Sequence, residues 1–199
     1  MSTPASKHSP IRLAVIVGST REGRFGPTVA NWFVDHASQR GDLEIDVVDL
    51  ADFELPSQFG QAGSEAMAPF RERIGLADAF AVVTPEYNHG YPASLKQAID
   101  FVNVEWHAKP VGFVSYGGIS GGLRTVEQLR LVFAELHAVT IRDGVSLHDG
   151  WNLFDEAGAM HEPENPLIAV KMMLDELTWF ARVLRTARAE RPYDSLAAA

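Results

Sequence analysis

The segment "AFAVVTPEYNHGYPASLKQAID", Ala79–Asp100, holds a strand, a loop and a helix in succession. Its first residues are apolar or β-branched and indicate a buried strand that ends at Pro85. Pro92 then stands where a helix begins, and Leu95 and Ile99 start a buried stripe at helical spacing. A buried strand followed directly by an amphipathic helix is typical of the βα units of a parallel sheet.

The same alternation continues on both sides of this segment. Further apolar strands are expected at Ile11–Gly18, Leu43–Leu50, Lys109–Tyr116 and Ala138–Leu147, the last with a bulge at Asp143-Gly144. Helical patterns lie between them, and the last helix runs over Pro166–Ala189. Five apolar strands joined by helices imply parallel pairing with cover on both faces. We therefore predict a three-layer α/β architecture, with one domain over residues 11–190 and short tails at 1–10 and 191–199.

Composition narrows the possible functions. The chain has no cysteine, which excludes disulfides, thiolate nucleophiles and iron–sulfur ligation. Its net charge of −9 argues against nucleic-acid or anionic-membrane surfaces. No apolar run approaches the ~18 residues of a membrane span, and the first residues lack the apolar core of a secretory signal, so we expect a cytoplasmic protein. The histidines follow no metal-ligand spacing, and no metal site is expected.

The loops after the first, third and fourth strands carry the unusual chemistry. In an open α/β sheet, ligands bind beyond the carboxyl ends of the strands, which is the edge these loops share. The first loop, "GSTREGRFGPT" (Gly18–Thr28), offers hydroxyls, two arginines and a following helix start. These groups favour an anion site, although neither a dinucleotide fingerprint nor a P-loop is present. The alternative is a polar turn with solvated arginines.

The second and third loops suit a flat ligand. In "PEYNHGY" (Pro85–Tyr91), two tyrosines flank Asn88 and Gly90, which tolerate positive φ. The alternative is a tight turn whose tyrosines only pack. In "SYGGISGG" (Ser115–Gly122), four glycines let the main chain approach a ligand closely, whereas the alternative is a flexible loop. A phosphate pocket, an aromatic wall and a backbone edge on one sheet together suit flavin mononucleotide (FMN).

The motifs "GSTREGRFGP", "PEYNHGYPASLKQAID" and "SYGGISGG" together resemble the NAD(P)H-dependent FMN reductase family, which includes quinone, chromate and azo-dye reductases. The likeness extends over about Ile11–Ala138. It implies a flavodoxin-like fold, with a five-stranded parallel sheet in the order 2-1-3-4-5 and helices on both faces. It also implies a homodimer or homotetramer, with the helix after the second loop at the interface.

The resemblance also implies roles for matching positions. The FMN phosphate would lie at Ser19, Arg21, Arg24, Phe25, Gly26 and Pro27. The flavin ring would lie at Pro85, Glu86, Tyr87, Asn88 and His89, with its other edge along Ser115, Tyr116, Gly117 and Gly118. NADPH or NADH would be the co-substrate of a ping-pong reaction that ends on a small acceptor. No side chain is expected to be catalytic, because the flavin N5 atom carries the chemistry.

Two alternatives remain at this point. The stretch "GISGG", Gly118–Gly122, matches the nucleophile elbow of serine hydrolases. Ser120 would be its nucleophile, followed by Asp143 or Asp149 and then His161. The second alternative is a redox sensor or electron carrier that binds FMN without turnover. Two arginines in the first loop favour a reductase, since dedicated flavodoxins usually carry a threonine-rich phosphate loop.

Overall fold

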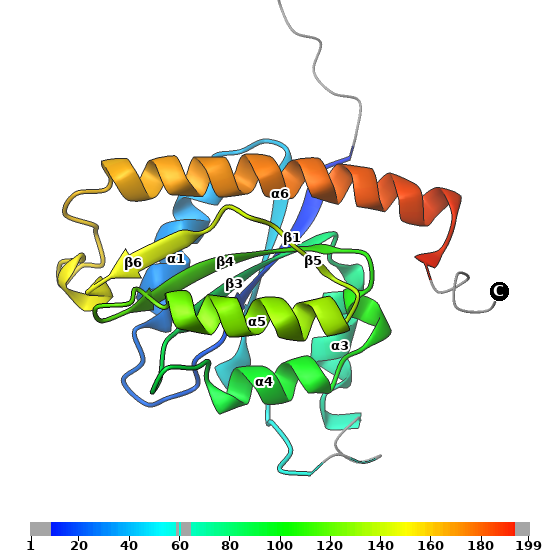
Figure 1. Cartoon of the computed structure of the whole chain (residues 1–199), viewed down its shortest axis with the longest axis horizontal. Coiled ribbons are helices and arrows are strands. Elements are labelled where there is room, and N and C mark those ends of the chain that lie inside the picture. The colour runs from blue at the N-terminus through cyan, green and yellow to red at the C-terminus, as the bar shows by residue number, and fades with distance from the viewer. Residues whose placement is uncertain (1–8, 59, 61–64, 194–199) are drawn as a thin grey trace, which may run out of the picture.

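The computed structural model of the chain describes residues 9–58, 60 and 65–193. It has three layers, with a central sheet between two groups of helices (Figure 1). The expected tails at 1–10 and 191–199 lie largely outside the described residues. Their described parts make contacts: Arg185 donates to the carbonyl oxygens of Ser9 and Pro10, each at 3.0 Å, and the Tyr193 hydroxyl lies 3.1 Å from Nδ1 of His137.

The sheet has the predicted order, β2-β1-β3-β4-β5, and its strands pair in parallel. β1 spans Ile11–Val17, β2 Leu43–Asp49, β3 Ala79–Pro85 and β4 Pro110–Gly117. Every residue of β3 and β4 is buried, as expected for strands covered on both faces. The predicted flavodoxin-like arrangement is therefore confirmed.

The fifth strand differs from the prediction because it is split in two. β5, Val139–Thr140, and β6, Val145–His148, both pair with β4. The chain leaves the sheet between them, and Arg130 there donates to the carbonyl oxygens of Ile141 (2.6 Å) and Arg142 (3.1 Å). Glu176 accepts from the N–H groups of Arg142 and Asp143 on the other side. The Asp-Gly pair thus marks an interruption rather than a bulge within one strand.

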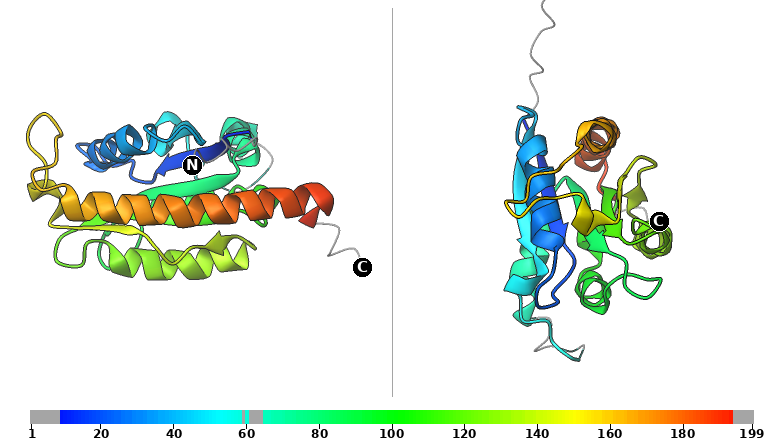
Figure 2. Two further views of the ribbon diagram at one scale, coloured as in Figure 1. Left: turned by 90° about the horizontal axis from the view of Figure 1, so that it is seen from above. Right: turned by 90° about the vertical axis from the view of Figure 1, so that its left-hand side faces the viewer.

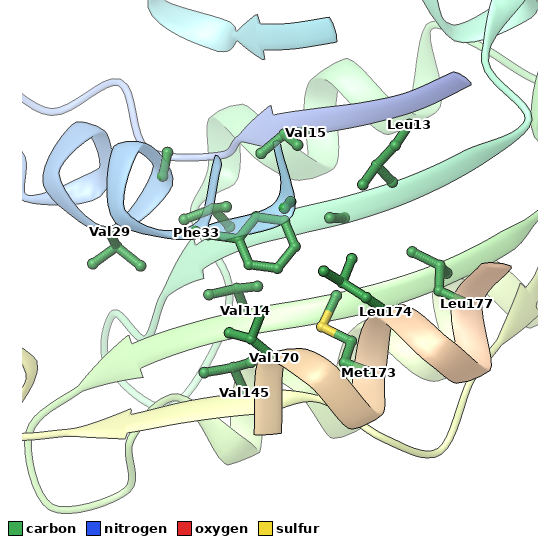
Figure 3. Close-up of a cluster of buried hydrophobic side chains, with 14 of the residues drawn as sticks. Leu13, Val15, Val29, Phe33, Val114, Val145, Val170, Met173, Leu174 and Leu177 are labelled. Carbon is green, nitrogen blue, oxygen red and sulfur yellow. The ribbon is translucent and has the colours of Figure 1, made fainter. Parts of the chain in front are cut away.

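Different helices cover the two faces of the sheet (Figure 2). α1 (Gly26–Ala37) and α6 (Glu164–Glu190) cover one face, while α3 (Ala68–Leu76), α4 (Ala93–Asp100) and α5 (Leu123–Glu135) cover the other. Figure 3 shows the core on the α1–α6 side, where Phe33 packs among Val15, Val114 and Leu174. Among the helices of the described residues, none has the length and apolarity to span a membrane.

Candidate functional site

One cavity of about 640 Å³ lies where the loops after β1, β3 and β4 meet. The right-hand view of Figure 2 looks onto this end of the molecule. The volume is within the range of small-molecule sites. Its walls come from Arg21, Glu22, Gly23, Arg24, Phe25, Pro85, Glu86, Tyr87, Asn88, Tyr116, Gly117 and Trp151. Most of the predicted residues therefore do share one site, and Glu22, Gly23 and Trp151 are additions.

The two arginines of the first loop have different environments. Arg21 is exposed and forms no ion pair with any described residue. Arg24 is held by Asp49, the last residue of β2, with Nη1–Oδ1 at 2.5 Å and Nη2–Oδ2 at 2.7 Å. It also donates to the carbonyl oxygen of Ser19 at 2.7 Å. The hydrogen bond to Asp49 raises the pKa of Arg24 despite partial burial, so its charge and orientation are fixed.

The start of α1 reaches the cavity through Phe25, whereas Gly26 is buried and neither Gly26 nor Pro27 lines the cavity. The helix begins at Gly26, and its N-cap residue Phe25 makes no side-chain capping bond. The first N–H groups of a helix lack intrahelical partners and carry the positive end of the helix dipole. Pro27 lies in the first turn, where its missing N–H is no loss. Uncapped N–H groups beside Arg21 form an arrangement that binds phosphate groups.

The second loop is a tight two-residue turn. Tyr87 N–H donates to the Gly90 carbonyl at 2.9 Å, and Gly90 N–H donates to the Tyr87 carbonyl at 3.0 Å. The two residues between them, Asn88 and His89, have φ of 49° and 76°. This is the φ pattern of a type I′ turn. Asn88 uses the positive φ that it tolerates, whereas Gly90 does not, and His89 takes that conformation as the second turn residue. The backbone oxygen of His89 accepts from Gln128 Nε2 at 2.8 Å, and His89 does not line the cavity.

A cluster of hydroxyls connects the three loops. The Ser19 hydroxyl lies 2.6 Å from the Tyr87 hydroxyl and is fully buried beneath the cavity wall. The Tyr116 hydroxyl, at the end of β4, lies beside this pair. Burial raises the pKa of Tyr116, and the neighbouring Tyr87 raises it further, so its phenol stays protonated at neutral pH. The cluster fixes the relative positions of the three loops.

Glu86 is a buried but charged member of the site. Only 7% of its side chain is exposed, and Arg124 holds it through Nη1–Oε1 at 2.8 Å and through the Arg124 N–H at 3.2 Å. Burial alone would raise the pKa of Glu86, but hydrogen bonds from Ser120 and Arg124 outweigh it and lower the pKa. In the described part of the chain, no hydrogen bond joins Ser120 to a histidine. The nucleophile-elbow interpretation therefore has no structural support.

The glycines of the third loop allow the loop to pack closely against its neighbours, as well as allowing a ligand to approach the main chain. Gly121 and Gly122 have φ of 60° and 85°. A Cβ on Gly122 would lie 2.6 Å from the Ser115 Cβ, and one on Gly121 would lie 2.5 Å from the Ser146 Oγ. The Ser115 hydroxyl donates to the Gly121 carbonyl at 2.8 Å and faces away from the cavity, contrary to its expected place along the ring.

Trp151 is one of the three wall residues that sequence reasoning did not assign to the site. It lies on a short 3-10 turn, Gly150–Asn152, and is 53% exposed. The turn is docked on the third loop: the Asp149 N–H donates to the Gly118 carbonyl at 3.1 Å. A Cβ on Gly150 would lie 3.2 Å from the Tyr116 Cβ, a tight contact, so glycine favours this close approach. The indole is thereby held at the cavity mouth.

Comparison with known proteins gives a consistent result. The family model "NADPH-dependent FMN reductase" matches residues 11–152. An NAD(P)H-dependent FMN reductase of Schizosaccharomyces pombe is 38% identical over 121 residues, covering 56% of this chain and 60% of that protein. This chain thus spans about three fifths of that relative's length. A quinone reductase of Pseudomonas putida is 30% identical over 166 residues, covering 78% of this chain and 88% of that protein.

A solved structure shows the same fold. The flavoenzyme NAD(P)H:(acceptor) oxidoreductase of Paracoccus denitrificans superposes with a TM-score of 0.69 at 20% identity, covering 86% of this chain and 98% of that one. The family match begins at the first residue of β1 and ends within the turn that carries Trp151, so it includes every wall of the cavity. The chain belongs to the NADPH-dependent FMN reductase family.

Proposed function

We propose that the chain is an FMN-dependent NAD(P)H oxidoreductase that passes electrons to a small acceptor such as a quinone. The cavity of about 640 Å³ carries this proposal, because three loops far apart in sequence build it together. Family membership supports the cofactor and the co-substrate. The names of the relatives support quinones and azo dyes as acceptors.

The residues present fit FMN. At one end, Arg21, which forms no ion pair with a described residue, and Phe25, the N-cap residue of α1, line the cavity, so positive charge and the start of a helix are available to a phosphate. At the other end, Tyr87 and Trp151 provide aromatic surface, and the main chain of Glu86–Asn88 and of Gly117 provides polar groups for a ring edge. Arg24 supports the phosphate end from its fixed position against Asp49. Ser19 lies beneath the cavity wall and contributes indirectly, because its hydroxyl group holds the Tyr87 hydroxyl in place.

Bound FMN supplies the redox chemistry, accepting a hydride from NAD(P)H and giving electrons to the acceptor. The chain's own residues bind and orient the flavin and keep water away from it. None of them is assigned as an acid or base. Tyr116 stays protonated through burial, and Glu86 stays charged but engaged with Arg124. We assign NAD(P)H and the acceptor to the same open side of the cavity, beside Trp151. They bind there one after the other, as in a ping-pong scheme.

The proposal extends to assembly and location. We propose a cytoplasmic homodimer or homotetramer in which α4, the helix after the second loop, contributes to a contact between subunits. The outer side of α4 forms a shallow hollow with Tyr91 and the partly exposed Lys96 and Gln97. This hollow adjoins the second loop, so a contact there would place a neighbouring subunit near the cofactor cavity.

An anaerobic absorption experiment tests the function. The purified chain is titrated with FMN and then mixed with NADPH or NADH, and the visible flavin absorption is followed. A bound flavin spectrum that bleaches within seconds and recovers on addition of a quinone supports the reductase. Binding without bleaching would favour a redox carrier or sensor. Absence of flavin binding would overturn the assignment of the cavity.

A further inference from the structure

The longest helix carries apolar side chains on the side that faces away from the core. Val170, Met173, Leu174 and Leu177 turn toward the sheet, as Figure 3 shows. Four other large apolar side chains of α6 face solvent, namely Ile168 (58% exposed), Met172 (48%), Trp179 (60%) and Val183 (47%). We call these four residues the outer stripe. A helix that is apolar on both sides is normally covered on both sides.

The outer stripe lies along one side of the helix, in two apolar pairs separated by Asp175 and Glu176. At 3.6 residues per turn, its members fall within an arc of about 60° that lies opposite the buried stripe. Seen from above in Figure 2, no other element of the described chain lies over α6. Trp179 is additionally oriented by its neighbour Phe180, whose ring lies edge-on at 4.9 Å. Trp and Met are enriched in the cores of protein interfaces, and Trp is a frequent hot spot there.

The spacing of the outer stripe identifies its partner. From Ile168 the intervals are four residues to Met172, seven to Trp179 and four to Val183, and the same series is read from the other end. Such a stripe is self-complementary under a two-fold axis, which is the symmetry of most homodimers. In an antiparallel pair of α6 helices, Met172 of one copy meets Trp179 of the other. Ile168 likewise meets Val183 over a length of about 22 Å.

The carboxylates at the centre of this pair of helices already have hydrogen-bond partners within their own copy. The centre falls between Asp175 and Glu176, so carboxylates from both copies approach each other there. Asp175 accepts from Arg40 Nη1 at 2.5 Å and from Lys171 Nζ at 2.6 Å. Glu176 accepts from two backbone N–H groups of the segment between β5 and β6. Local partners therefore offset the repulsion that four unpaired carboxylates would cause.

We propose that a second copy of this chain packs on the outer stripe, with the two α6 helices antiparallel about a two-fold axis between Asp175 and Glu176. The contact lies on the helix layer opposite α4 and is independent of the cofactor cavity. It is therefore an interface additional to the α4 contact of the proposed function. A chain that used both contacts would form an assembly larger than a dimer.

Sedimentation or light scattering of the full chain tests the contact. Trp179→Glu is expected to halve the mass measured for the wild type at the same concentration. Leu131→Glu, at a position on α5 that is 76% exposed, is the matched control and should leave the mass unchanged. Thermal melting and FMN binding are measured on each variant to verify folding, and Met172→Glu replaces Trp179→Glu if that variant does not fold. An unchanged mass in the folded variant, or a wild type that is monomeric throughout, overturns the proposal.

Cysteine pairing tests the orientation, since the chain has no cysteine of its own. A tagged Met172→Cys chain is mixed with a Trp179→Cys chain and oxidised. The antiparallel pair predicts a disulfide between the two variants and none within either variant alone. Two copies of residue 172 would lie about 10 Å apart along the axis, beyond the ~7 Å limit for a disulfide. Linkage of Met172→Cys to itself, or failure of the mixture to link, contradicts the antiparallel register.

Discussion

The guanidinium of Arg24 and the carboxylate of Asp49 form a two-pronged ion pair at the edge of the cofactor cavity, with N–O distances of 2.5 and 2.7 Å. Their side chains are 17% and 19% exposed, so the pair is largely shielded from solvent. Its position follows from the sheet register, which aligns Asp49 with Val17, the residue before the first loop. The pair holds Arg24 in a fixed position at the end of the cavity that we propose for the phosphate, whereas the Arg21 side chain is exposed.

The first prediction concerns this pair. Arg24→Ala should weaken FMN binding about tenfold or more, because it removes one cation and leaves the Asp49 carboxylate without its partner near the phosphate. Arg24→Ala combined with Asp49→Asn should recover part of the lost affinity. Flavin titrations of both variants measure the effect. If the double variant binds FMN no better than Arg24→Ala, Asp49 has no electrostatic influence on the site.

The second prediction concerns Trp151. If the indole is the aromatic wall at the cavity mouth, Trp151→Ala should raise the KM for a quinone several-fold or weaken FMN binding, whereas Trp151→Phe should retain most of both. An aromatic stacking contact is worth about 1 kcal/mol, which corresponds to roughly fivefold. Steady-state kinetics with a quinone and a flavin titration provide the two readouts. Equal behaviour of the Ala and Phe variants would show that the aromatic ring plays no part.

Much of the fold was predictable because strands buried on both faces form nearly continuous apolar runs. The order of the strands and the convergence of three polar loops followed from that pattern and the family resemblance. The split of the fifth strand was not predictable, since Ile141 and Val145 continue the apolar pattern through the interruption. What breaks the strand is tertiary: Arg130 and Glu176 bind the backbone between β5 and β6 from two different helices.

The missed features of the site depend on contacts between distant segments. Asp49 reaches Arg24 only through the pairing of β1 with β2, although a carboxylate at the carboxyl end of a strand is a signal that could be sought. Trp151 follows Gly117 by more than 30 residues and reaches the cavity because its turn docks on the Gly118 carbonyl. The positive φ of His89 was missed because residue preferences favour glycine, whereas a type I′ turn requires the left-handed region at both central positions.

The third prediction separates structural from functional glycines in the third loop. Gly122→Ala should destabilise the protein by about 2–4 kcal/mol, because an alanine at φ of 85° is strained and its Cβ would overlap Ser115. Gly118→Ala is the matched control, since its Cβ would meet nothing nearer than Trp151 at 4.0 Å. Urea unfolding of both variants gives the comparison. Similar free energies of unfolding for the two variants would refute the packing argument.

The last prediction concerns Lys109, a lysine that is only 6% exposed. Its Nζ donates to the carbonyl oxygens of Ile74 and Gly75 at the end of α3, each at 2.9 Å, and lies 5.7 Å from the centre of the Phe80 ring. Burial, assisted by the positive charge of Arg188, lowers the pKa of Lys109 to about 8 in the folded protein. Between that value and the ordinary 10.5, the unfolded chain binds more protons than the folded one.

Because the unfolded chain binds more protons in this window, the free energy of unfolding should rise as the pH increases from 8 to 10.5, by about 3 kcal/mol at most. Urea unfolding at pH 7.5 and at pH 10, about the two ends of the window, measures it. Lys109→Met lacks the titrating group, so the stability of the wild type relative to this variant should increase over that interval. Lys96→Met, at the partly exposed pair with Asp100, is the control for loss of one lysine. A relative stability of wild type and Lys109→Met that stays constant, or falls, would show that the buried ammonium is not destabilised in the folded state.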